Sequence, residues 1–144
     1  MKLSKIFFYV FFCVIILGCH NENISGGAVV TGHPEATKIG IQVLEIGGNA
    51  IDASIAMQLA LAVCLPNAGN IGGGGFMVCR MNNGDTYTLD FREKAPKKSS
   101  KDMYLDKGGN IIDSLSTYGN LAVGIPGTID GIFAAHTKFG SIGI

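Results

Sequence analysis

The sequence predicts an α+β fold in which helices are layered on an antiparallel sheet. Three observations support this fold class. Residues 35–46 and 50–64 have the apolar patterns of two consecutive helices, residues 76–91 contain two β-rich runs around a turn, and residues 128–138 have the pattern of another helix. Helices that precede and follow a hairpin bury their apolar sides against it, which produces stacked layers.

The first predicted helix, residues 35–46, follows a short strand candidate at 29–31. Pro34 suits the start of this helix, because its missing N–H group would have no partner in the first turn. Gly47-Gly48 follows it, and glycine commonly ends helices. The helix is expected to be amphipathic. The apolar residues on its single apolar face are Ala36, Ile39, Val43 and Ile46.

The second predicted helix, residues 50–64, is apolar almost all round. A soluble helix of this kind is normally buried in a layered core. Asn49 can cap its N-terminus, and Pro66 stops it. A membrane-spanning role is excluded because the helix is short and contains a carboxylate. Its polar residues are Asp52, Ser54 and Gln58.

The clearest β signal lies at 76–81 and 86–91. The turn between these two runs contains Asn83-Gly84, and an Asn-Gly turn between β-rich runs is a strong hairpin signal. We therefore predict two antiparallel strands joined by a tight turn.

The remainder of the chain is less regular. Residues 94–118 are polar, with turn-forming residues at 107–110. Residues 121–123 are a second short strand candidate. Pro126-Gly127 then leads into the predicted helix at 128–138, which has one apolar side.

The N-terminus has the pattern of an export signal. Two lysines precede residues 6–17, an unbroken apolar run that is too short to span a bilayer comfortably. The run ends in Gly18-Cys19, which resembles a bacterial lipobox, where the cysteine is lipidated and becomes the mature N-terminus. We predict a lipoprotein signal peptide at 1–18, lipidation of Cys19, a tether at 19–27 and a periplasmic or cell-envelope location. An ordinary cleaved signal and an uncleaved anchor are the alternatives.

Composition and charge exclude several classes of protein. Apolar residues make up 47% of the chain and charged residues 15%, so it can bury a sizeable core. The net charge is zero and no basic stripe is present, which argues against a nucleic-acid partner. The spacing of cysteines and histidines matches no metal pattern, and neither a metal nor a cofactor is expected. Cys64 and Cys79 are interpreted as buried free thiols rather than a disulfide.

Gly72-Gly73-Gly74-Gly75 invites comparison with a phosphate-binding loop. That interpretation fails, because the glycines follow a helix and open a strand, and no Gly-Lys-Ser/Thr follows. The favoured interpretation is a tightly packed turn into a buried strand. The alternative is a backbone wall against a ligand, since glycine permits close approach.

Asp90-Phe91-Arg92-Glu93 places three charges where the second strand is expected to leave the sheet. Arginine binds carboxylates through two parallel hydrogen bonds and keeps its charge, so Arg92 suits recognition of an anionic group. Neutralisation of Arg92 by the neighbouring acids, in a structural ion pair, is the other interpretation. The motif alone leaves both open. No serine, cysteine or threonine has a recognisable nucleophile context.

Four segments together resemble the large-subunit region of the γ-glutamyltranspeptidase family. Their order and spacing make the resemblance specific, and it extends over about residues 27–143. The segments are 47–53 (GGNAIDA), 70–77 (NIGGGGFM), 90–96 (DFREKAP) and 124–128 (GIPGT).

The resemblance implies an N-terminal-nucleophile hydrolase with a four-layer αββα sandwich. The family makes a precursor that cleaves itself into a large and a small subunit. A threonine freed at the start of the small subunit attacks the γ-glutamyl carbonyl of glutathione and related amides, and water or an amino-acid or peptide acceptor then resolves the acyl-enzyme. The role of the arginine in this family, binding of the substrate's α-carboxylate, maps onto Arg92.

The catalytic threonine of the family has no counterpart in these 144 residues. We therefore expect residues 28–144 to be the N-terminal part of a large subunit, an incomplete sandwich that is inactive alone and has no catalytic residue of its own. Two alternatives stay open: a cephalosporin acylase or capsule-linking relative of the same fold, and a non-catalytic, degenerate lipoprotein.

Overall fold

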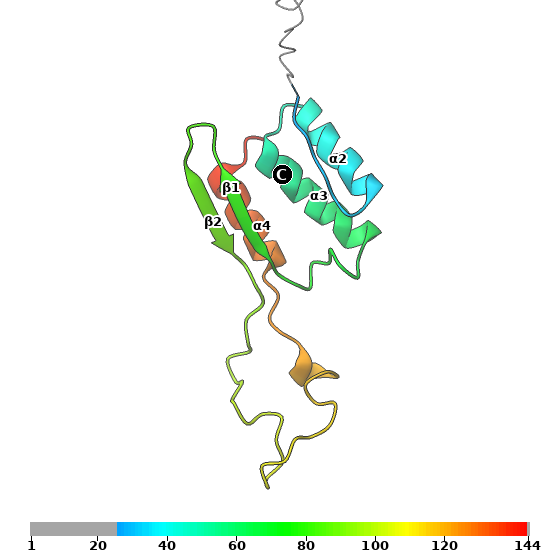
Figure 1. Cartoon of the computed structure of the whole chain (residues 1–144), viewed down its shortest axis with the longest axis vertical. Helices are drawn as coiled ribbons and strands as arrows, with labels where there is room; N and C mark the ends of the chain where they lie inside the picture. The colour runs from blue at the N-terminus through cyan, green and yellow to red at the C-terminus, as the bar shows by residue number, and fades with distance from the viewer. Residues whose placement is uncertain (1–25, 144) are drawn as a thin grey trace, which may run out of the picture.

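The computed structural model describes residues 26–143, so the predicted signal peptide and Cys19 lie outside the described residues. Its elements confirm the α+β class and follow the order expected from the sequence (Figure 1). Each of the three predicted helices and both hairpin strands is present, with ends within one residue of the expected ones. The elements are α2 (Pro34–Glu45), α3 (Ala50–Cys64), β1 (Phe76–Arg80), β2 (Thr86–Asp90), the short 3-10 helix η1 (Asn120–Ala122) and α4 (Thr128–Phe139).

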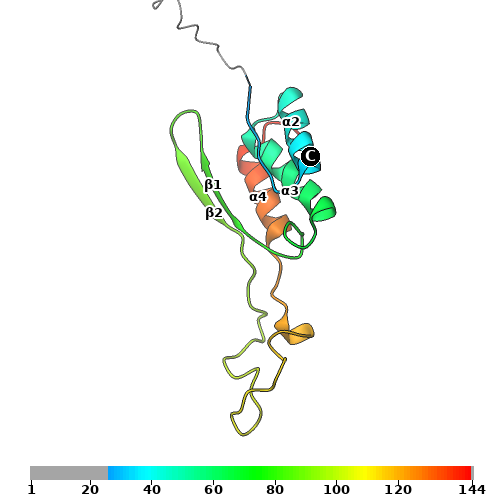
Figure 2. The ribbon, with the colours of Figure 1, turned by 45° about the vertical axis from the view of Figure 1, so that its right-hand side comes forward.

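The hairpin is covered on one face by α3 and α4, while α2 packs on α3 on the side away from the hairpin (Figure 2). β1 and β2 are antiparallel, with Met77 opposite Leu89. The two strands alternate between half-buried and exposed residues, as one-sided sheets do. The core cluster comprises Ile51 and Ile55 of α3 and Ile132 and Ala135 of α4, against which Met77, Cys79, Leu89 and Phe139 pack.

The outer face of the hairpin is open among the residues described, and two large apolar side chains of β1 lie on it beside polar residues. Phe76 is 66% exposed and Val78 is 79% exposed. Both lie on the face of β1 opposite to the core residues Met77 and Cys79. No helix within residues 26–143 is long and apolar enough to cross a membrane.

The junction of α2 and α3 forms as the sequence predicts. Pro34 occupies the first turn of α2, and Gly47 follows the helix at φ 94°, a conformation that favours glycine. Asn49 caps α3, since its Oδ1 accepts hydrogen bonds from the backbone N–H groups of Ile51 (2.8 Å) and Asp52 (3.0 Å). The Asp52 carboxylate in turn accepts one from the Asn49 N–H at 2.8 Å.

The two short strand candidates are wrong. Residues 29–31 form no strand with any of the described residues. The Thr31 hydroxyl bonds both the N–H and the C=O of His33, which turns the chain into α2 instead. At 121–123 the chain forms η1, and the Leu121 carbonyl accepts the hydroxyl of Tyr104 at 2.9 Å. A strand needs a neighbouring backbone, and neither segment has one here.

Residues 94–124 form a long excursion that extends away from the layered body (Figure 1). Its base is closed by two backbone hydrogen bonds between Lys94 and Ile125, of 3.1 and 2.8 Å. The predicted turn at 107–110 is present. There the Asp106 carboxylate accepts hydrogen bonds from the N–H groups of Gly108 and Asn110. These hydrogen bonds lower the pKa of Asp106.

Cys64 and Cys79 are half-buried free thiols. Cys64 is the last residue of α3, and Cys79 lies on the core-facing side of β1. Within residues 26–143, no group of three or more His, Cys, Asp or Glu side chains could hold a metal ion.

The Asp52 carboxylate ties the chain after α4 to the start of α3. It is 5% exposed and accepts hydrogen bonds from the Ser141 hydroxyl at 2.6 Å and the Ser141 N–H at 3.1 Å. Burial raises its pKa, but the hydrogen bonds from Ser141, Asn49 and Ile142 favour the ionised form more strongly, so the pKa of Asp52 lies below its ordinary value. The ionised carboxylate therefore stabilises the fold.

We expect Asp52→Asn to lower the free energy of unfolding by about 2–4 kcal/mol at neutral pH, because it removes the charged acceptor of several buried donors. A lowered folded pKa means that the stabilisation is complete above the ordinary value of about 3.9 and is lost as the pH falls through the folded pKa. Thermal unfolding of wild type and variant should therefore converge in acid. Asp113→Asn, an exposed acid of the excursion, is the control. A constant difference down to about pH 3 would contradict the assignment.

Candidate functional site

Arg92 lies where the second strand leaves the sheet, as the sequence predicts. β2 ends at Asp90, whose Oδ1 accepts a hydrogen bond from the backbone N–H of Arg92 at 3.0 Å. The ladder continues for one further bond, from the Phe91 N–H to the Gly75 carbonyl at 3.0 Å. Asp90 therefore shapes the backbone at Arg92 and leaves the guanidinium free for other partners.

The Arg92 side chain is exposed and weakly held. Its Nε lies 3.9 Å from Oε2 of Glu93, and the two side chains are 64% and 39% exposed. Its guanidinium carbon lies 5.8 Å from the centre of the Phe76 ring. An exposed pair at this distance contributes little to stability. A guanidinium that is exposed and weakly paired in this way can bind a carboxylate through two hydrogen bonds.

The backbone at Arg92, in contrast, is packed closely against two glycines. A Cβ at Gly74 would lie 2.5 Å from the Phe91 carbonyl oxygen and 2.8 Å from the Arg92 Cα. A Cβ at Gly127 would overlap the same carbonyl oxygen. Only residues without a Cβ allow three segments to approach this closely.

Hydrogen bonds join the same three segments. The Gly73 carbonyl accepts the N–H groups of Gly127 (2.8 Å) and Thr128 (3.1 Å), at the start of α4. Three of the four segments that carry the resemblance, 70–77, 90–96 and 124–128, therefore meet around Arg92. The fourth, 47–53, lies at the opposite end of α4, where Asn49 donates to the Phe139 carbonyl at 2.7 Å.

The contacts agree with the packed turn favoured for the glycine run at 72–75. Gly74 and Gly75 lie against the backbone at Arg92 and the Phe91 ring. The strand that follows alternates between half-buried and exposed residues and is not the buried strand expected from the sequence. Pro126-Gly127 leads into a helix as predicted, because α4 begins at Thr128.

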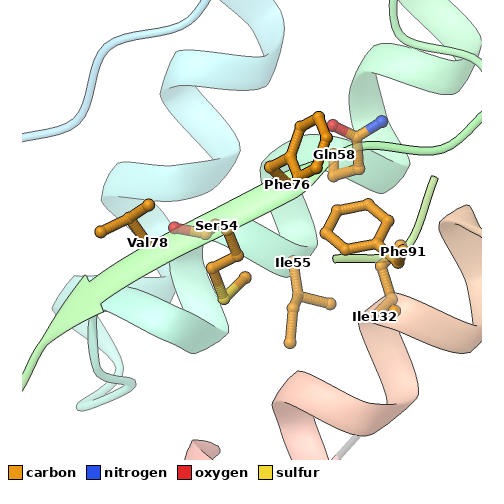
Figure 3. A pocket seen from close by; sticks show the side chains of 9 residues that line it. Ser54, Ile55, Gln58, Phe76, Val78, Phe91 and Ile132 are labelled. Carbon is orange, nitrogen blue, oxygen red and sulfur yellow. The ribbon is translucent and has the colours of Figure 1, made fainter. Parts of the chain in front are cut away.

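Phe91 also contributes to this region, although the sequence did not single it out. Its ring borders a cavity of about 290 Å³ between α3, β1 and α4, beside Ile132 (Figure 3). Gly131, one turn into α4, is buried against this ring. A glycine inside a helix is unfavourable by itself, so Gly131 was the signal that something packs there closely.

Comparison with known proteins agrees with the geometry. The family model for gamma-glutamyltranspeptidase matches residues 36–144. The glutathione hydrolase proenzyme of Pseudomonas sp. (strain A14) is 55% identical over 115 residues, which are 80% of this chain and 20% of that protein. The chain thus spans about a fifth of the length of the curated relatives it matches.

Solved structures give the same result. The γ-glutamyltranspeptidase of Helicobacter pylori is 52% identical, with a TM-score of 0.80 over 85% of this chain and 35% of that chain. The Bacillus anthracis transpeptidase CapD is more distant, at 28% identity and a TM-score of 0.64 over 83% of this chain and 35% of that chain. The acylase ACY 1 proenzyme of Pseudomonas sp. (strain SE83) is 36% identical over 86% of this chain and 24% of that protein. The family model matches most of the chain, and the chain has the N-terminal-nucleophile hydrolase fold. It therefore belongs to the γ-glutamyltranspeptidase family.

Proposed function

We propose that this chain supplies the donor-anchoring part of an enzyme that transfers the γ-glutamyl group of glutathione and related amides. The observation that carries the proposal is the exposed guanidinium of Arg92 on a rigidly packed backbone. A guanidinium without strong partners, on a closely packed backbone, can orient the α-carboxylate of an amino-acid donor. The γ-carbonyl of the donor is then presented to a nucleophile elsewhere.

The nucleophile of this reaction is proposed to be a threonine of the small subunit, cut from the same precursor. It would attack the γ-glutamyl carbonyl, and water or an amino-acid or peptide acceptor would release the acyl group. The chain's part is recognition, and alone it is expected to be inactive.

The two related activities are less well supported. The acylase and the CapD transpeptidase are 36% and 28% identical to this chain, against 55% for the glutathione hydrolase proenzyme. The donor group distinguishes them, because Arg92 suits a free α-carboxylate.

The test uses the complete precursor, or a chimera in which residues 36–144 replace the matched segment of the Escherichia coli relative, which is 46% identical. We expect hydrolysis of a γ-glutamyl anilide and faster release of the anilide with a dipeptide acceptor. A β-aspartyl anilide, which shortens the distance between carboxylate and scissile bond, is the control donor. Activity on a simple acyl anilide that lacks the α-carboxylate, with none on the γ-glutamyl donor, would refute the proposal.

We further propose that the protein is a lipoprotein of the cell envelope, because Gly18-Cys19 ends an apolar run that follows two lysines. Cells fed a palmitate analogue should label the wild type, and Cys19→Ala should lose the label and leave the membrane fraction. Cys13→Ala, within the apolar run, is the matched control and should keep it. Equal labelling of wild type and Cys19→Ala would refute lipidation at this cysteine.

A further inference from the structure

The residue before Arg92 is built into the fold more tightly than Arg92 itself. Phe91 continues the ladder of β2 by one hydrogen bond, and its ring enters the space between β1 and α4 (Figure 3). The alternation of the strand persists here, since Asp90 is exposed, Phe91 half-buried and Arg92 exposed. Successive side chains of a strand point to opposite faces, so an inward Phe91 sends Arg92 outward.

The Phe91 ring occupies a slot lined by glycines. A Cβ on Gly131 would overlap the Cγ of Phe91 and lie 2.6 Å from its Cβ. A Cβ on Gly75 would lie 3.0 Å from Cε2 and 3.1 Å from Cζ of the ring. The ring is thus confined from the side of α4 and from the turn before β1. The carbonyl of Phe91 is confined as well, by Gly74 and Gly127.

Among residues 26–143, the guanidinium of Arg92 has no comparable restraint. Its contacts are the 3.9 Å pair with Glu93 and the Phe76 ring at 5.8 Å. The direction of the side chain therefore depends on the backbone, and the backbone depends on the packing of Phe91 together with the hydrogen bond that the Arg92 N–H donates to Asp90.

We propose that Phe91 is a positioning residue for Arg92: its ring, seated in the slot of Gly75 and Gly131, sets the direction in which Arg92 leaves the sheet and so the place of the donor's carboxylate. This inference rests on the proposed function. Phe91 need not touch the donor. Misplacement of a bound group by about 1 Å can lower a rate roughly 100-fold, so a residue with this task has a measurable effect.

The test uses the complete precursor or the chimera, with a γ-glutamyl anilide as donor. Phe91→Ala should raise KM and lower kcat/KM roughly 100-fold, and Phe91→Leu, which refills much of the slot, should restore most of it. Phe139→Ala is the matched control. Phe139 packs on the same core at the other end of α4, with its ring 4.9 Å from that of Tyr87. It should lower thermal stability while leaving kcat/KM within about threefold.

A double-mutant cycle separates positioning from general packing. If Phe91 acts through Arg92, Phe91→Ala should change kcat/KM by less than about threefold in an Arg92→Ala background. Full additivity of the two effects would overturn the proposal. Should Phe91→Ala be insoluble, Phe91→Leu takes its place in the cycle, with the same criterion.

The outcomes also separate this inference from the proposed function. Absence of γ-glutamyl hydrolysis in a processed wild type refutes the proposed function and, with it, the role of Phe91. Activity that depends on Arg92 but is unchanged in both Phe91 variants refutes the positioning role alone.

Discussion

Arg92→Ala in the complete protein should lower kcat/KM for a γ-glutamyl anilide by roughly 30-fold to several-thousand-fold. In the complete enzyme the bound carboxylate is expected to be shielded from water, and loss of a charge-assisted pair in such a site costs on the order of 2–5 kcal/mol. Each 1.36 kcal/mol corresponds to about a tenfold change in rate. The substitution removes a contact with the donor that is remote from the scissile amide, so both KM and the placement of the carbonyl should suffer. Steady-state kinetics of the purified enzyme measure this.

Two further variants define the role. Arg92→Lys should recover only part of the loss, because a point charge cannot reproduce the planar fork. Arg80→Ala is the matched control, since Arg80 is exposed on the same outer face, at the far end of β1. Precursor cleavage should be spared in all three, as it uses no donor. If kcat/KM of the Arg92→Ala enzyme stayed within about twofold of wild type, Arg92 would be a structural residue and not a donor-binding one.

Gly127→Ala should destabilise the protein more than the addition of a methyl group at any other glycine in this part of the chain. Its Cβ would overlap the Phe91 carbonyl oxygen, and the contact is with backbone, which cannot rotate away. The backbone of Gly127, at φ −120° and ψ −10°, is open to alanine, so the effect isolates the overlap. We expect destabilisation of at least about 3 kcal/mol, at the upper end for overpacking, and poor soluble yield.

Gly109→Ala provides the opposite case. Gly109 has φ 83° and nothing within 4 Å of a Cβ, so alanine there adds strain without overlap. It should cost about 1–2 kcal/mol. Soluble yield and thermal unfolding of the two variants compare the effects directly. Equal stability losses would mean that the close approach at Gly127 relaxes easily.

The sequence was most informative where a local rule decides the structure. Pro34, Asn49 and Asn83-Gly84 each act within a few residues, so the ends of α2 and α3 and the hairpin turn were predictable. Arg92 could be placed at a strand end for the same reason. The resemblance then suggested a role for it that its own charges left undecided.

Features that depend on contacts between residues far apart in the sequence were not predictable. Residues 121–123 are apolar, but Leu121 and Ala122 belong to a 3-10 turn, and the Leu121 carbonyl accepts the Tyr104 hydroxyl instead of a strand neighbour. The Asn49 cap of α3 could be predicted from the sequence, whereas the bonds of the Asp52 carboxylate to Ser141 join residues 89 positions apart. Likewise, no residue near Phe91 in the sequence indicates that its ring packs against Gly131. Apolar periodicity predicts which face of an element is buried, but not which residues pack against that face.

The contacts between α3 and the end of the chain, in the core and between Asp52 and Ser141, also have a consequence for the order of events during synthesis. The core joins Ile55 to Ala135, a separation of 80 residues, so α3 emerges from the ribosome long before its partners in α4. At a synthesis rate of about 5–20 residues per second, this interval lasts roughly 4–16 s. Throughout it, α3, the most apolar of the helices within residues 26–143, has only α2 and the nascent hairpin for cover, which makes it a natural target for chaperones.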